Sequence, residues 1–286
     1  MKYAVIDIGS NSVRLMVSDG KATLYKKLSV TRLGAGRDNE GNLSLESQKK
    51  SLSAISDFVK EAQRERVDKV FAFATAAVRN APNGREFVLK VRKACGFDVD
   101  VLSGEKEAEL GILGALDGND GGIIDVGGAS TEIGVVKNGK IIYLHSLPIG
   151  AVALTEAFGQ NAEEIKKYVK ETVKLYGSVP KTEFYAIGGS ATTVAAVDLK
   201  LKDYDPNIID GHKLKRENLL KITELLNRKT PQERENICGV EKRRADIIHS
   251  GAIILSEIVE YLDISQITVS ESDNAEGYLT YAVENL

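Results

Sequence analysis

The chain has 286 residues, of which 43% are hydrophobic and 28% are charged, and its formal net charge is −3. This length and composition allow a packed core in one large domain or two ordinary ones, and they exclude a disordered chain. The net charge excludes a protein built mainly to coat nucleic acid, because such proteins carry a large positive excess. Cys95 and Cys238 lie far apart without metal-ligand spacing, which indicates two free thiols in a reducing compartment.

The sequence predicts neither an export signal nor a membrane span. Lys2 is followed by a short apolar run that already reaches Asp7, which does not fit a signal peptide. The longest apolar runs fall far short of the roughly 20 residues that cross a bilayer. We therefore expect a cytoplasmic protein with no membrane partner.

The first predicted element in the chain recurs later. Residues 6–17 read IDIGSNSVRLMV and residues 124–135 read IDVGGASTEIGV, so Asp7 and Asp125 stand 118 residues apart. Each copy predicts a strand that ends at an Asp, a break at Gly and small residues, and a second strand. Asp19-Gly20 and Asn138-Gly139 follow the second strands, and both dipeptides are typical of type I′ hairpin turns that lead into a third strand.

After each of these meanders the pattern alternates between helices and strands. Helices are predicted over residues 44–66, 103–116, 161–176, 215–228 and 241–262. Strands are predicted over residues 69–75, 98–102, 182–189 and 267–272. Ser44 is available as an N-cap. The order indicates two α/β domains, residues 1–117 and 118–286, joined by the linker sequence LDGNDGG at 116–122.

The two Asp-Gly loops have the composition of a phosphate site. Gly lets the backbone approach a phosphate, and turn amides that point one way form an anion-binding concavity. Each Asp supplies a hard oxygen ligand for Mg²⁺. Two such loops in register favour a phosphate site over two plain hairpins with a capping Asp. A third glycine element, at residues 186–197, places Gly188, Gly189 and Ser190 at a helix N-terminus, where an anion is stabilised.

These segments also resemble the exopolyphosphatase / guanosine pentaphosphate phosphatase (Ppx/GppA) family, a branch of the actin-like ATPase superfamily. The resemblance covers essentially the whole chain and includes DIGSNSVRL (7–15), ATAAVRNAPN (74–83), SGEKEAEL (103–110), DVGGASTE (125–132), IGGSATT (187–193) and RRADIIHSGA (243–252). It implies two RNase H-like domains (actin-like ATPase, or ASKHA, type) with an active-site cleft between them. It also implies a hydrolase that releases terminal phosphate from inorganic polyphosphate or pppGpp by metal-assisted attack of water.

Carried over position by position, the resemblance implies a role for individual residues. Glu107 would be the general base for the attacking water, with Asp125 and Glu132 as the other catalytic carboxylates. Asp7, Asp125 and Glu132 would bind Mg²⁺ or Mn²⁺. The phosphate-binding residues, which include the third glycine element, would be Ser10, Asn11, Ser12, Thr75, Arg79, Gly127, Gly128, Ser130, Thr131, Gly188, Gly189 and Ser190.

Two of these residues also have a plain structural interpretation. A Glu whose pKa is raised by burial suits a general base, but Glu107 also lies in a first helical turn, where acids are favoured. The fork of an Arg matches phosphate oxygens, but Arg79 also suits a surface cation that caps a short helix.

The chain departs from the family pattern at four positions. Ala129 replaces a third Gly, so the loop there either avoids a positive φ or adopts it at some cost. Ala153 and Ala275 stand where an Arg is usual, and Asp273 where a Gly is usual. We therefore expect a long polyphosphate to bind weakly, and catalytic efficiency to rise little or fall as the chain becomes longer. The KRR run at 242–244 is interpreted as a solvated helix face, with lining of the substrate groove as the alternative.

Two other functions stay open. A kinase of the actin-like fold would need a segment that binds an acceptor, and the sequence shows no sugar-binding segment. A non-catalytic sensor of guanosine polyphosphates or nucleotides has less need of four carboxylates, namely Asp7, Glu107, Asp125 and Glu132. Phosphate release without an acceptor separates the hydrolase from the kinase, and binding without turnover indicates the sensor. We expect no nucleic-acid partner and leave a homodimer open.

Overall fold

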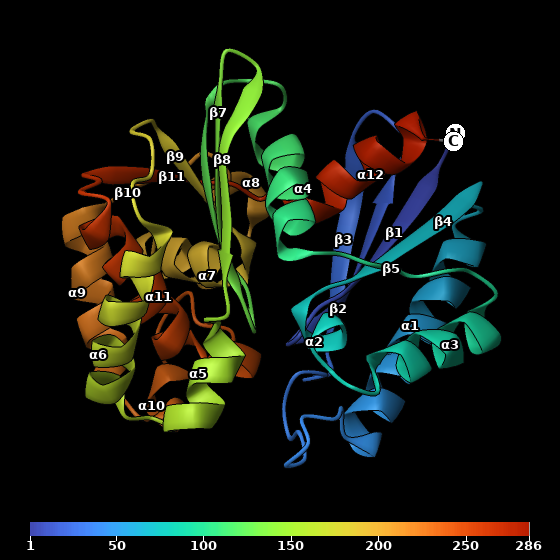
Figure 1. Ribbon diagram of the computed structural model, residues 1–286, viewed down its shortest axis with the longest axis horizontal. Helices are drawn as coiled ribbons and strands as arrows, with labels where there is room; N and C mark the ends of the chain where they lie inside the picture. Colours follow the sequence, from blue (N-terminus) through green and yellow to red (C-terminus); the bar gives the residue numbers. More distant parts are fainter. Residues whose placement is uncertain (286) are drawn as a thin grey trace.

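The computed structural model describes residues 1–285, which form two α/β halves beside each other (Figure 1). The first half opens with a meander of β1 (Tyr3–Ile8), β2 (Ser12–Ser18) and β3 (Thr23–Val30). The second opens with β6 (Gly121–Val126), β7 (Thr131–Lys137) and β8 (Lys140–Leu147). Asp7 lies opposite Arg14 in the first meander, and Asp125 lies opposite Glu132 in the second. The sequence repeat is therefore a structural repeat.

The turns that close the two meanders differ. Asn138 and Gly139 alone join β7 to β8, with φ of 54° and 67°, as a type I′ turn requires. The type I′ turn expected at Asp19-Gly20 is wrong, because Asp19 instead begins a four-residue loop. Its Oδ1 accepts hydrogen bonds from the amides of Lys21 (2.8 Å) and Ala22 (2.9 Å), which stabilises the longer turn.

The two sheets share one topology. The first sheet runs β3-β2-β1-β4-β5, with β4 at Lys69–Ala74 and β5 at Asp100–Val101. The second runs β8-β7-β6-β9-β11 in the matching order, with β9 at Phe184–Ile187 and β11 at Gln266–Val269. It adds β10 (Lys213–Lys215) at its edge. This repeated order confirms the two RNase H-like domains of the actin-like ATPase architecture.

Four of the five predicted helical ranges are helical along their length, and the structure adds helices that the sequence analysis did not predict. The first half contains α1 (Leu45–Arg64), α2 (Ala76–Arg79) and α3 (Gly84–Cys95). The second contains α5 (Ala151–Phe158), α6 (Ala162–Thr172), η1 (Val173–Tyr176), α7 (Gly188–Asp198), α8 (Pro206–Ile209), α9 (Arg216–Asn227), α10 (Pro231–Arg234), η2 (Lys242–Arg244) and α11 (Ile248–Tyr261). Ser44 caps α1 as predicted, with its side chain accepting from Ser47 N. No helix within residues 1–285 combines the length and apolarity needed to cross a membrane.

One predicted helix is interrupted. The range 241–262 holds the short η2 and then α11, which begins only at Ile248. The carbonyl of Ala245 accepts a hydrogen bond from the buried guanidinium of Arg234 (3.1 Å). That side-chain bond replaces a helical backbone bond and lets the chain turn between the two elements.

Two helices cross between the halves: α4 (Gly104–Leu116) and α12 (Asn274–Glu284) (Figure 1). Ile112 of α4 packs in an apolar cluster with Ile123 of the second sheet. Tyr278 of α12 packs with Val5 and Phe73 of the first sheet. The two helices also pack on each other. Each helix thus covers the sheet of the other half.

The predicted domain boundary at 117/118 falls in the turn between α4 and β6. Asp117 and Gly118 take φ of 45° and 81° there, which ends α4 sharply. The crossing of α4 and α12 is close because Gly114 and Gly277 face the partner helix, where a Cβ would overlap backbone atoms of Asp273 and Leu110. The halves are therefore connected by packing as well as by the linker.

Candidate functional site

The two Asp-Gly loops have the same internal geometry. The amide of Gly9 donates to Ser12 O, and the amide of Gly127 donates to Ser130 O, both at 3.0 Å. Ala129 is absent from the residues with positive φ, so within this loop the replacement of Gly carries no backbone strain. The duplicated sequence therefore builds duplicated loops.

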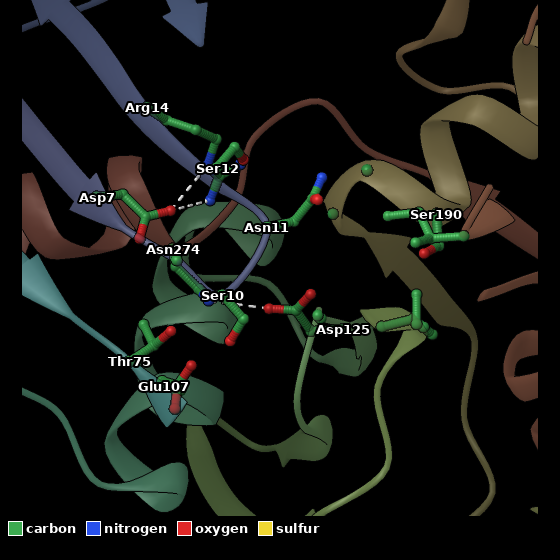
Figure 2. Close-up of a pocket in the computed structure, with 18 of the residues that line it drawn as sticks. Asp7, Ser10, Asn11, Ser12, Arg14, Thr75, Glu107, Asp125, Ser190 and Asn274 are labelled. Atoms are coloured by element: carbon green, nitrogen blue, oxygen red, sulfur yellow. Dashed lines mark hydrogen bonds and ion pairs between the residues drawn. The ribbon is translucent and has the colours of Figure 1, made fainter. Parts of the chain in front are cut away.

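The loops meet across the space between the halves (Figure 2). A Cβ on Gly128 would lie 2.9 Å from the Cβ of Ser10, so only a glycine fits the approach at that point. The cleft between the loops is lined by thirteen of the predicted site residues: Asp7, Ser10, Asn11, Ser12, Thr75, Glu107, Asp125, Gly127, Gly128, Glu132, Gly188, Gly189 and Ser190.

Three predicted phosphate-binding residues do not line the cleft. Thr131 is fully buried and its hydroxyl donates to Ile149 O (2.6 Å), which fixes the loop rather than facing the cleft. Ser130 is also buried, and its hydroxyl bonds the Glu132 carboxyl. Arg79 pairs with Glu107 and donates to the carbonyl of Leu102 (2.7 Å).

In the first half, Asp7 is held by a cation. Its Oδ2 accepts from Arg14 Nε at 2.7 Å and from Arg14 Nη2 at 2.5 Å (Figure 2). Its Oδ1 is buried without a partner. Burial raises the pKa of Asp7 in spite of Arg14. One carboxylate oxygen is therefore fixed and the other is free for a ligand.

In the second half, Asp125 lies among other acids. Its Oδ2 accepts from Asn274 Nδ2 (2.9 Å), and burial together with nearby Asp273 raises its pKa to about 6. Glu132 is 1% exposed and accepts from Ser146 Oγ (2.7 Å). Burial, followed by Glu107 and Asp125, raises the pKa of Glu132 well above its ordinary value. This shift favours the protonated form of Glu132.

Glu107 reaches the cleft from the first turn of α4. Ser103 caps that helix by accepting from Lys106 N (3.1 Å). Glu107 is 5% exposed, and burial raises its pKa to about 7 although the paired Arg79 opposes the shift. A carboxylate with a pKa near neutrality can take a proton from water.

The third glycine element begins α7 at the cleft. Gly188 has φ of 80°, and a Cβ there would lie 2.7 Å from Asp125 Oδ1. A Cβ on Gly189 would overlap the guanidinium of Arg244, which lies across this helix end. The free amides of the first turn and the Arg244 guanidinium are groups that can stabilise an anion at this helix end.

Three functional side chains were missed by the sequence analysis: Arg14, Arg244 and Asn274 all line the cleft. The prediction that residues 242–244 form a solvated helix face is correct for Lys242 and Arg243, which are exposed. It is wrong for Arg244, which is partly buried and lines the cleft. Arg14 and Glu132 occupy matching positions of the 118-residue repeat, each opposite the Asp of its loop. This match in the sequence could have identified Arg14 as a site residue.

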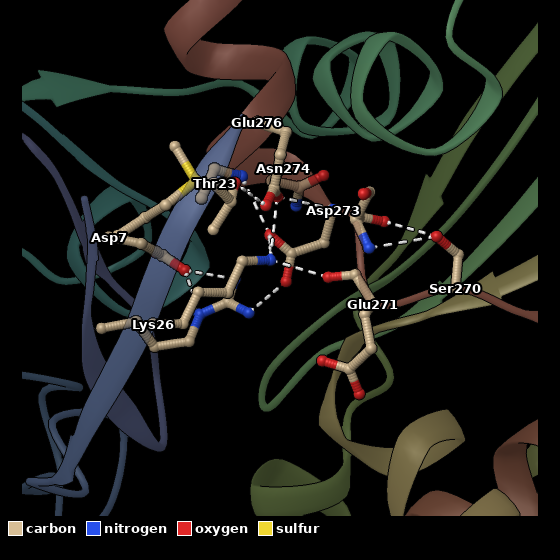
Figure 3. Close-up of polar contacts among 12 residues, drawn as sticks. Asp7, Thr23, Lys26, Ser270, Glu271, Asp273, Asn274 and Glu276 are labelled. Carbon is tan, nitrogen blue, oxygen red and sulfur yellow. Dashed lines mark hydrogen bonds and ion pairs between the residues drawn. The ribbon is translucent and has the colours of Figure 1, made fainter. Parts of the chain in front are cut away.

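The departures at 273 and 275 have structural explanations. Asp273 pairs with Arg14 and lies 3.7 Å from Lys26 Nζ (Figure 3). These two cations outweigh burial and lower its pKa to about 2. Ala275 is 4% exposed inside the apolar cluster of Val5 and Phe73. The expectation that Ala275 removes a cation from the substrate track is therefore wrong, because its side chain faces the core.

The charge arrangement fits a two-carboxylate metal site. Within residues 1–285 no three His, Cys, Asp or Glu side chains form a metal-binding group, so Asp7, Asp125 and Glu132 are not a closed cage. Mg²⁺ is commonly bound by one or two carboxylates, with substrate phosphates and water completing the shell. The unpartnered Oδ1 of Asp7, with Asp125 across the cleft, fits this kind of site. Glu132, opposite Asp125 on the next strand, stays a predicted third ligand.

Comparisons with known proteins agree on one family. The family model described as "Ppx/GppA phosphatase family" matches residues 13–285. A Fusobacterium nucleatum "Bifunctional 3-dehydroquinate synthase/phosphatase" is 30% identical over 99% of this chain, which spans only 46% of that protein. "Exopolyphosphatase 2" of Mycobacterium tuberculosis is 28% identical over 96% of this chain and 97% of its own length. The crystal structure of the Aquifex aeolicus Ppx/GppA family member is 29% identical, covers 100% of this chain and 98% of its own, and has a TM-score of 0.83.

Proposed function

Since the chain belongs to the Ppx/GppA phosphatase family, we propose that it is a phosphohydrolase that releases the terminal phosphate of a phosphoanhydride by metal-assisted attack of water. The observation that supports this most is Glu107, a buried carboxylate with a pKa of about 7 in a cleft between two phosphate loops. A positioned base of this kind can take the proton of an attacking water.

The cleft residues divide the work of such a reaction. The loop amides, the first turn of α7 and Arg244 would hold the terminal phosphate, and Glu107 would take the proton of the attacking water. Asp7 and Asp125 would hold a Mg²⁺ or Mn²⁺ ion, which offsets phosphate charge when bound. Glu132, which lies opposite Asp125 on the next strand, would support the same ion as the third carboxylate.

Inorganic polyphosphate is the proposed substrate, because the Mycobacterium tuberculosis relative is named an exopolyphosphatase, and pppGpp is the second candidate from the family resemblance. Both arginines of the cleft already face acids, Arg14 with Asp7 and Asp273 and Arg244 with Glu241 at 3.6 Å. Little positive charge is left for a long tail, so short chains should be cleaved as well as long ones. The cytoplasmic location and a homodimer remain predictions.

Phosphate release from short polyphosphate, long polyphosphate, pppGpp and ATP, each with Mg²⁺ or EDTA, tests this function. We expect Mg²⁺-dependent release that EDTA abolishes. Glu107→Gln should lower kcat by about 10²–10⁴-fold while KM and the melting temperature stay near wild type.

Each alternative has its own outcome in the same assay. A fully active Glu107→Gln enzyme would remove the general base, and release in EDTA would remove the metal. Tight binding without turnover would indicate the sensor, and phosphate transfer only to an added acceptor would indicate the kinase.

A further inference from the structure

The two cleft aspartates sit at matching positions of the repeat, but their neighbours on the next strand differ. Arg14, opposite Asp7, donates two hydrogen-bonding groups to it. The matching position opposite Asp125 is Glu132, which cannot supply a cation. The duplicated fold therefore leaves the second aspartate without the cross-strand donor that the first one has.

Asn274 supplies a donor to Asp125 from elsewhere in the chain. Its Nδ2 lies 2.9 Å from Asp125 Oδ2, across 149 residues of sequence. Asn274 is 5% exposed and lines the cleft as the first residue of α12. A Cβ on Gly111 of α4 would lie 2.9 Å from Asn274 Oδ1, so a larger residue at 111 would crowd the amide. The site has been shaped around this side chain.

The backbone that carries Asn274 is itself tied to the first half. Asp273 caps α12 by accepting from Ala275 N (2.9 Å), and its carboxylate pairs with Arg14. Lys26 of β3 lies 2.9 Å from Glu276 and bonds the carbonyl of Glu271 (2.7 Å) (Figure 3). One dipeptide, Asp273-Asn274, is thus connected to both cleft aspartates, to Asp7 through Arg14 and to Asp125 directly.

We propose that Asn274 is a positioning residue that holds the Asp125 carboxylate in the orientation needed to bind the divalent cation. The inference rests on the proposed metal-dependent function. Groups that hydrogen-bond a metal-binding carboxylate fix its orientation, and their removal typically weakens metal affinity or activity by about 10–100-fold. Asn274 therefore does for the second loop what Arg14 does for the first.

Mn²⁺ binding to the full chain without substrate, followed by electron paramagnetic resonance, tests the inference with Asn274→Leu. Leu keeps nearly the same size but cannot donate. We expect Mn²⁺ affinity to fall by about 10–100-fold, and KM for short polyphosphate at saturating Mn²⁺ to change by less than about threefold. If Leu at this position prevents folding, Asn274→Ala takes its place, because Ala removes the donor and adds neither bulk nor charge.

Tyr278→Phe is the matched control on the same helix. It removes the hydroxyl that contacts Asp100 and loosens α12 without touching a cleft carboxylate. It should keep wild-type Mn²⁺ affinity; an equal loss would show that helix docking matters rather than the amide, and would overturn the inference. Unchanged Mn²⁺ affinity in Asn274→Leu would overturn it as well. If wild type itself binds no Mn²⁺, the metal role in the proposed function fails, and the inference with it.

Discussion

The loops at residues 7–12 and 125–130 share their backbone geometry and differ in the charges beside them. Each closes with the same 3.0 Å bond from a Gly amide to a Ser carbonyl. Beside the first loop, Arg14 compensates the charge of Asp7. Beside the second, Glu132 adds a buried acid whose pKa is raised. The two loops share one backbone geometry, while the matching cross-strand position holds a cation in the first half and an acid in the second.

This difference makes the site chemically asymmetric. The first loop offers a carboxylate with a fixed orientation and one free oxygen. The second gathers Asp125, Glu132 and the nearby Glu107, all with raised pKa values. We therefore expect proton transfer on the second side of the cleft, where Glu107 lies. Three experiments test this division.

The largest expected effect is a difference in the free energy of unfolding between Arg14→Gln and Glu132→Gln, the two matching cross-strand positions. Arg14→Gln leaves Asp7 and Asp273, each with a side chain only 7% exposed, without their shared guanidinium. Removing one member of a buried ion pair typically costs about 3–5 kcal/mol. Glu132→Gln keeps the shape of the side chain and an oxygen that accepts from Ser146, so its cost should be well below that of Arg14→Gln. Urea unfolding at pH 7 measures both, and equal losses would contradict the asymmetry.

The pH dependence of the rate should follow the acids of the second side. The general base must be ionised, so kcat/KM should fall about tenfold per pH unit below the Glu107 pKa of about 7. Arg79 stabilises the ionised form, so Arg79→Gln should raise this pKa and move the fall to higher pH. Arg85→Gln makes the same charge change on the exposed face of α3 and should leave the profile in place. If Arg79→Gln leaves the pH profile of kcat/KM unchanged, the pH dependence does not come from Glu107.

The smallest effect should come from Asn11, whose counterpart in the second loop is Ala129. Both polar atoms of the Asn11 amide are buried without partners, and the side chain lines the cleft. Asn11→Ala makes the loops alike and removes a hydrogen bond that only substrate can complete. KM should rise about 2–10-fold, corresponding to one hydrogen bond, with an unchanged or higher melting temperature. A lower melting temperature would show that Asn11 supports the loop instead.

Local sequence patterns predicted most of the fold. The repeat from Ile6 and Ile124 gave both meanders, and Ser44 marked the start of a helix that the structure confirms. The wrong predictions lie where a side-chain hydrogen bond determines the backbone conformation. Asp19 accepts two amide bonds and enlarges its turn, and Arg234 takes the carbonyl of Ala245 out of a helix. Hydrogen bonds of this kind depend on which side chain lies next to which backbone group, and the periodicity of apolar residues carries no information about that.

The site was predictable where the residues belong to a contiguous motif. Asp7, Glu107 and Asp125 were found this way and meet in one cleft, although their roles remain predictions. Asn274 was missed, because its contact with Asp125 crosses 149 residues and arises only when α12 packs on α4. Ala275 was misread for the same reason: alternate residues at a helix start point to cleft and core, and sequence alone did not show which.

The crossing of α4 and α12 has a consequence for how the chain is made. Val5 on β1 is synthesised long before Ala275 and Tyr278, which complete its apolar cluster. The first sheet therefore waits with one face uncovered while the whole second half is synthesised, a period in which exposed apolar surface invites aggregation or chaperone binding. Nascent chains that end before residue 274 should therefore be protease-sensitive at β1, and chains that extend beyond α12 should be protected there.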